Sequence, residues 1–78
     1  MRYEVTSLVS GRPVPGWKVW GRRRAQKMAD GLVDYYRNAG LEYEVMVSRL
    51  SGEMCWYYSA SYEREGIPPL EGSPDLPS

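Results

Sequence analysis

The chain has 78 residues, with 10 lysines and arginines against 10 aspartates and glutamates, one cysteine and no histidine. This length allows one domain with a small hydrophobic core, and a single cysteine excludes an intrachain disulfide. The lack of histidine excludes His-based catalytic triads, imidazole acid–base catalysis and HExxH-type metal sites. We therefore predict a non-enzymatic protein without metal or cofactor. We also predict a homodimer, because oligomerisation commonly stabilises so small a domain.

The cellular location is predicted from the N-terminus and the cysteine. The first five residues carry charges at Arg2 and Glu4 and lack the apolar stretch of a signal peptide. No stretch of the sequence reaches the length of a transmembrane helix. Cys55 lies in a predicted strand and is expected to be a buried structural residue, and a lone cysteine is typical of a reducing compartment. We expect a cytoplasmic protein that does not bind membranes.

The first predicted elements are two strands. Residues 2–9 alternate with the period of a β-strand, and residues 17–20 form a second, shorter strand. Between them, residues 10–16 contain two glycines, two prolines and a serine, a composition typical of turns. We expect a hairpin whose strands are joined by a long, semi-rigid loop. If residues 17–20 are only a loop, the same architecture remains with one strand fewer.

A helix is predicted from about residue 22 to residue 39. Its apolar side chains recur at steps of three and four on one stripe: Ala25, Met28, Ala29, Leu32, Val33, Tyr36 and Ala39. Gly40 follows as a typical helix-ending residue. Gly31 lies off the stripe, and a mid-helix glycine costs about 1 kcal/mol relative to alanine. Tolerance at an exposed position, or close approach of another backbone, would account for Gly31.

A second hairpin is predicted after the helix. Residues 43–47 and 54–62 each alternate between two faces, and residues 51–52 are a Ser-Gly turn signal between them. Residues 66–78 then hold four of the six prolines and two glycines. This composition predicts a disordered or extended acidic tail that does not continue the sheet.

Together these elements predict an α+β fold in which one helix packs on a three- to four-stranded antiparallel sheet. The predicted order is strand, strand, helix, strand, strand. Residues 1–65 form the single domain, and residues 66–78 form the Pro/Gly-rich acidic tail.

The zero net charge hides a difference between the two halves of the chain. Residues 1–40 hold eight basic and three acidic residues, for a net charge of +5, and residues 41–78 hold two and seven, for −5. Such asymmetry indicates an interaction surface, complementarity within the chain, or head-to-tail self-association.

The sharpest single feature is the run Arg22-Arg23-Arg24 at the predicted start of the helix. The helix dipole opposes each cation there by about 0.3–1 kcal/mol, and Gly21 is a weak cap. Breaking local rules in this way is typical of a functional site. We predict partner-binding residues around this end of the helix: Arg22, Arg23, Arg24, Lys18, Trp17, Trp20 and Lys27, with Arg12 contributing to the same charge.

Three interpretations of the arginine run remain open. The arginines are solvated or paired with Glu42, Glu44 or Glu53, or they bind an acidic protein partner. In the third interpretation they bind nucleic-acid phosphates while Trp17 and Trp20 stack on bases. The zero net charge disfavours nucleic acid, because domains that bind it are usually basic overall.

Several features together resemble small orphan proteins of tailed bacteriophages of actinobacteria. They are the short start at residues 1–5, the Pro15-Gly16-Trp17 segment, an arginine- and alanine-rich helix and an acidic proline tail. This resemblance implies a cytosolic accessory protein that binds a host component. We therefore predict a small non-catalytic protein-binding module. The alternative is a small nucleic-acid-binding accessory protein that uses the arginine-rich start of the helix.

Overall fold

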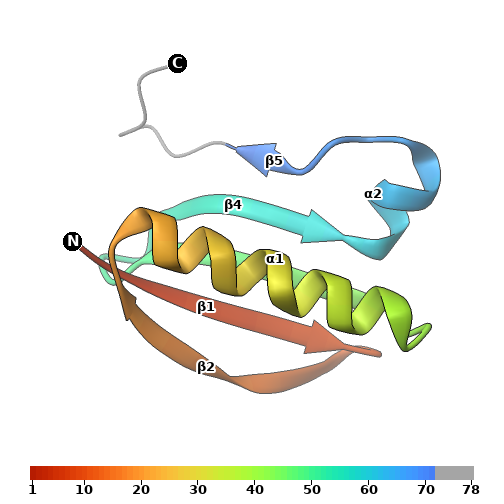
Figure 1. Cartoon of the computed structure of the whole chain (residues 1–78), viewed down its shortest axis with the longest axis horizontal. Helices are drawn as coiled ribbons and strands as arrows, with labels where there is room; N and C mark the ends of the chain where they lie inside the picture. The colour runs from red at the N-terminus through yellow and green to blue at the C-terminus, as the bar shows by residue number, and fades with distance from the viewer. Residues whose placement is uncertain (72–78) are drawn as a thin grey trace.

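The computed structural model describes residues 1–71 and has an α+β fold with one five-stranded antiparallel sheet (Figure 1). The strand order in the sheet is β2-β1-β3-β4-β5. Along the chain the elements are β1 (Arg2–Val9), β2 (Arg12–Trp20), α1 (Arg22–Asn38), β3 (Tyr43–Arg49), β4 (Met54–Ser59), α2 (Ala60–Glu65) and β5 (Leu70–Glu71). The predicted class is therefore confirmed, with one helix and at least one strand more than expected.

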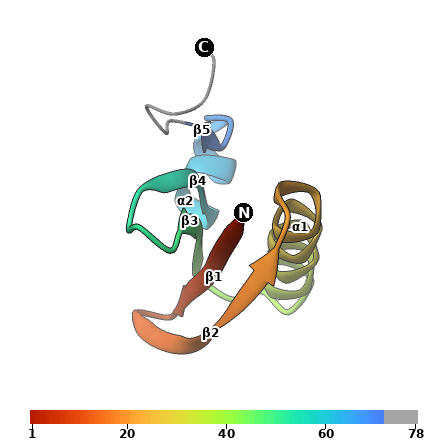
Figure 2. The same cartoon turned by 90° about the vertical axis from the view of Figure 1, so that its left-hand side faces the viewer.

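Helix α1 is the crossover between two strands that are not neighbours in the sheet. It joins β2 to β3, and both of these strands pair antiparallel with β1, which lies between them. Because its connection starts at one edge strand and returns beyond β1, α1 lies across a single face of the sheet (Figure 2). Within residues 1–71, no helix crosses the other face, which we call the open face.

The core lies between α1 and the sheet. Alternate residues of the strands point toward the helix, as the period of two requires. Ala25 and Ala29 are fully buried, and their small side chains allow α1 to approach the sheet closely. The buried core residues are Tyr3, Val5, Ala25, Ala29, Val33, Tyr36, Tyr43, Val45, Val47, Cys55, Trp56, Tyr58 and Ala60. The expectation that Cys55 is buried is confirmed.

The first hairpin differs from the prediction. Its loop is a two-residue turn at Ser10-Gly11, where both φ angles are positive (52° and 79°), as a type I′ turn requires. The expected long loop is instead part of β2, because an edge strand tolerates the missing N–H groups of Pro13 and Pro15. A bulge in β2, which places two residues opposite one of β1, absorbs the irregularity at Gly16.

The predicted helix is confirmed almost residue for residue. α1 begins at Arg22 after Gly21, and no side chain caps its first turn. Gly40 follows the helix with a φ of 71°, a left-handed conformation that glycine adopts without strain. No helix in residues 1–71 is both long enough and apolar enough to cross a membrane.

The C-terminal part of the prediction is wrong in two places. The strand expected to reach residue 62 ends at Ser59, whose hydroxyl accepts a hydrogen bond from the backbone N–H of Ser61 and so caps α2. Beyond α2, Leu70 and Glu71 pair with Tyr57 and Trp56, so the sheet gains a short edge strand. Residues 72–78 of the predicted tail lie outside the described residues.

Candidate partner-binding surface

The fold places the predicted site residues on two adjacent elements, β2 and α1, and it divides those of β2 between the two faces of the sheet. β2 ends one residue before α1 begins, so the aromatic residues of β2 and the arginines of α1 are neighbours around Gly21. We call the surface formed by β2 and the first half of α1 the basic side. It carries the predicted site residues Trp17, Lys18, Trp20, Arg22, Arg23, Arg24 and Lys27, together with Arg12.

The two tryptophans of the basic side lie on opposite faces of the sheet. Trp17 pairs with Val5, whose side chain is in the core, so Trp17 projects on the α1 face, where 43% of it is exposed. Trp20 pairs with Arg2 on the open face and is 61% exposed. The Arg2 guanidinium lies 5.2 Å from the centroid of the Trp20 ring. Of these two tryptophans, only Trp17 therefore lies on the same face of the sheet as α1.

Arg22 already has an aromatic partner within the chain. Its guanidinium carbon lies 4.9 Å from the ring centroid of Trp56, which is only 1% exposed. The indole Nε1–H of Trp56 donates a hydrogen bond of 2.5 Å to Glu71. Arg22 therefore covers the core between α1 and β4, although the sequence offers no sign that it differs from the next two arginines.

Arg23, Arg24 and Lys27 are exposed, and within residues 1–71 none of them forms an ion pair. Two of the carboxylates proposed as their partners are engaged elsewhere. Glu42 pairs with Arg64 at 2.5 Å, and Glu44 accepts a hydrogen bond from the Tyr57 hydroxyl. The interpretation that the arginine run pairs with these two glutamates is therefore wrong.

Every charged side chain in residues 12–29 is a cation. Residues 12–29 contain six cationic side chains and no carboxylate. Carboxylates return at Asp30 and Asp34 in the second half of α1, where Arg37 pairs with Asp34 at 2.8 Å. The basic surface therefore covers β2 and about two turns of the helix.

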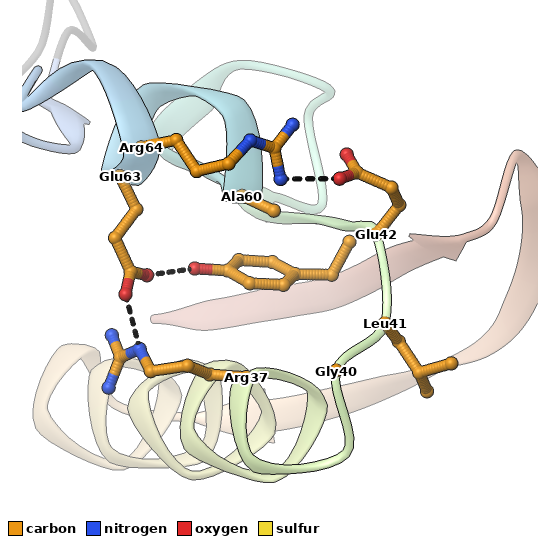
Figure 3. Close-up of a pocket in the computed structure, with 8 residues that line it drawn as sticks. Arg37, Gly40, Leu41, Glu42, Ala60, Glu63 and Arg64 are labelled. Carbon is orange, nitrogen blue, oxygen red and sulfur yellow. Dashed lines mark hydrogen bonds and ion pairs between the residues drawn. The ribbon is translucent and has the colours of Figure 1, made fainter.

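A second feature, which the sequence did not predict, is a cleft between the end of α1 and α2. It has a volume of about 290 Å³ (Figure 3). Glu63 of α2 is one of the residues that line it. It accepts a hydrogen bond of 2.5 Å from the Tyr43 hydroxyl and pairs with Arg37 Nε at 2.6 Å. The site was missed because it depends on α2, and the alternating residues there predicted a strand.

Contacts within this cleft move the pKa values of Glu63 and Tyr43 in opposite directions. Hydrogen bonds from Tyr43 and Arg37 lower the pKa of Glu63 below its ordinary value. Burial, together with the hydrogen bond to Glu63, raises the pKa of Tyr43 to about 12. The contacts of Glu63 with Tyr43 and Arg37 therefore tie α2 to β3 and to the end of α1.

No protein family, curated protein or solved structure matches this chain. The function must therefore be inferred from its own residues and their geometry.

Metal-binding groups are also sparse. Among residues 1–71 no three His, Cys, Asp or Glu side chains come together as a metal site would require.

Proposed function

We propose that this chain is a small non-catalytic module that binds a protein partner through its basic side. One observation carries the proposal: residues 12–29 hold six cations without a carboxylate, and within residues 1–71 none of the six is in an ion pair. Arg37 and Arg64, in contrast, are both neutralised by glutamates. Exposed cations without carboxylate partners, close to exposed tryptophan, are typical of a surface that meets an anionic partner.

A protein partner is favoured over nucleic acid by the placement of the aromatic residues. Trp17 and Trp20 lie on opposite faces of the sheet, so they do not form one stacking platform for successive bases. The Trp20 ring is also stacked by Arg2. Apolar Val19 and Met28 pack beside the basic side, and such residues suit the apolar side chains of a protein.

Affinity capture tests this proposal. We expect the immobilised chain to retain a protein from a nuclease-treated lysate of an actinobacterial host, and the triple variant Arg23→Glu/Arg24→Glu/Lys27→Glu to lose it. The matched control is Arg64→Glu, which reverses an exposed arginine on α2 and should leave capture unchanged. Capture that survives the triple variant would place the binding surface elsewhere.

Nucleic-acid binding is the second candidate function, and the uninterrupted positive charge of residues 12–29 supports it. In that case DNA binding would weaken steeply as salt rises, because phosphate contacts release counterions. The triple variant Arg22→Ala/Arg23→Ala/Arg24→Ala would then lose DNA binding. If it binds DNA as well as the parent does, this candidate fails.

A non-catalytic role is supported by the chemistry available. The sequence has no histidine, and Cys55 is buried in β4. Glu63 and Tyr43 have pKa values moved away from neutrality in opposite directions. General acid–base catalysis works best with a pKa near the operating pH.

We further propose that the protein is cytoplasmic, forms a homodimer and acts as a bacteriophage accessory protein on a host protein. The location is supported by the single unpaired cysteine. The phage assignment is supported by the resemblance of the whole chain to small phage orphan proteins. Detection of the chain in the soluble cytoplasmic fraction of infected cells would test both.

A further inference from the structure

One flank of α1 is tied to the rest of the domain along its whole length. Arg22 stacks on Trp56, the Tyr58 hydroxyl donates a hydrogen bond of 3.3 Å to Asp30, and Arg37 pairs with Glu63. The partners of these contacts belong to β4 and α2, and β4 lies on the opposite side of β1 and β3 from β2. That flank of the helix is therefore occupied by the chain itself.

The opposite flank of α1 faces β2, and among residues 1–71 it forms no ion pair or side-chain hydrogen bond with another element. Arg24, Met28, Gly31 and Tyr35 follow one another at steps of four, three and four, so they form one stripe along this flank. Trp17 of β2 projects on the same face of the sheet. We call the four stripe residues with Trp17 the α1–β2 flank.

The α1–β2 flank exposes aromatic surface above a half-buried apolar base. Tyr35 is 68% exposed and Trp17 is 43% exposed. Met28, in the stripe between them, is half-buried and packs against the core. Rigid aromatic side chains around an apolar base are typical anchor points for a protein partner.

Gly31 leaves an opening on this flank, and no contact within residues 1–71 requires glycine there. A Cβ atom at this position would meet no atom within 4 Å, so alanine would fit. Gly31 lies inside the helix, and glycine there costs about 1 kcal/mol relative to alanine. A partner backbone lying against the helix between Met28 and Tyr35 would need this missing side chain.

The positive charge on and beside this flank favours an anionic partner. Arg24 begins the stripe, and Arg23 and Lys27 lie on the adjoining exposed ridge of α1. Within the described residues these three cations have no carboxylate partner. An anionic segment would neutralise them, and apolar side chains would suit Trp17 and Met28.

We propose that the α1–β2 flank docks an acidic peptide segment of the partner protein, with its backbone against Gly31, an apolar side chain on Trp17 and its carboxylates on Arg24 and Lys27. This inference rests on the proposed function and specifies its partner. Nucleic acid lacks an apolar side chain for Trp17 and Met28, and the basic stretch ends at Asp30.

Calorimetric titration with short synthetic peptides tests the inference. The probes alternate glutamate with leucine or tyrosine, and the matched probes replace every glutamate by glutamine. We expect the acidic peptides to bind at least about tenfold more tightly than the neutral ones. Arg24→Glu and Gly31→Ala should each weaken binding by about tenfold. Glu65→Gln, at an exposed position of α2 away from the flank, should leave the affinity unchanged.

The Gly31→Ala variant distinguishes an effect on docking from an effect on stability. It should raise the midpoint of thermal unfolding while it weakens peptide binding. Equal affinity for acidic and neutral peptides would overturn the inference, and so would unchanged affinity in Arg24→Glu and Gly31→Ala.

Two other results would assign the flank to a different occupant. Tighter binding of a single-stranded oligonucleotide than of any acidic peptide would assign it to nucleic acid. Self-association that is lost in Arg24→Glu would assign it to a second copy. If the peptides fail while lysate capture still depends on Arg23, Arg24 and Lys27, only this inference fails and the proposed function stands.

Discussion

Arg22 and Arg23 are adjacent in the sequence and yet have different environments. Arg22 stacks on the buried Trp56 ring, whereas Arg23 is exposed and lines a shallow hollow with Gln26, Lys27 and Asp30. The sequence predicted the run as one feature, because the stacking depends on a residue of β4 that is distant along the chain. Only the fold separates the structural arginine from the solvated ones.

Two alanine variants measure this difference. We expect Arg22→Ala to lower the free energy of unfolding by about 0.5–2 kcal/mol, the range of a cation–π contact. Arg23→Ala should leave it unchanged or raise it slightly, because it removes a cation that the helix dipole opposes. Urea unfolding followed by tryptophan fluorescence gives both values. Equal losses in the two variants would contradict the assigned role of Arg22.

Glu63 gives the domain a dependence on acid pH. Its folded-state pKa is lowered, chiefly by the hydrogen bond from Tyr43 and then by Arg37, so its stabilising effect is present above the ordinary pKa of 4.5. This contribution is lost as the pH falls from there through the lowered pKa. We expect the urea midpoint of Glu63→Gln to fall less than that of the parent over this range. The control is Glu65→Gln, at a neighbouring exposed position, whose urea midpoint should depend on pH as that of the parent does. If the urea midpoint of Glu63→Gln also follows the parent over this range, the stabilising role assigned to Glu63 is contradicted.

The elements show which sequence patterns are reliable. β1 and α1 were predicted closely because their apolar residues keep a clear period over several turns or pleats. β2 was predicted too short, because Pro13 and Pro15 read as a loop unless the strand is known to lie at the edge of the sheet. α2 was missed because Tyr58, Ala60 and Tyr62 keep strand alternation through the point where Ser59 caps a helix.

Replacing glycine by alanine should have opposite effects on stability in β2 and in α1. At Gly16 a Cβ atom would lie 3.0 Å from Thr6 Cγ2 and 3.1 Å from the Val5 carbonyl oxygen, so the β1–β2 pair must shift. We expect Gly16→Ala to lower the free energy of unfolding by about 1–3 kcal/mol. Gly31→Ala should raise it by up to about 1 kcal/mol. Thermal unfolding followed by circular dichroism measures both; a stabilised Gly16→Ala would show that the bulge does not need glycine.

At the scale of the whole molecule, the net charge of zero is distributed unevenly. The cations of residues 12–29 all lie on β2 and α1, whereas most described glutamates of the second half are engaged by tyrosine, tryptophan or arginine. The charge difference between the halves was visible in the sequence. Its location on β2 and α1, and the division of Trp17 and Trp20 between two faces, required the fold.

The open face of the sheet bears on the proposed homodimer. Half-buried Leu8, Met46 and Tyr57 lie on it, and Trp20 is exposed on its β2 edge, which suits contact with a second copy. We expect light scattering to give twice the chain mass of 9.0 kDa, and Met46→Lys to give a monomer. A parent that is monomeric at high concentration would contradict the dimer, and an unaffected Met46→Lys dimer would place the interface elsewhere.

The central claim is that a protein partner binds the basic side of the domain. Mapping of backbone amide chemical shifts, with and without the captured partner protein, tests it most directly. The account predicts that the shifted amides cluster in β2 and the first half of α1, with the largest changes around Trp17, Arg24 and Gly31. Shifts confined to α2 and the cleft around Glu63, with β2 and α1 unchanged, would contradict it.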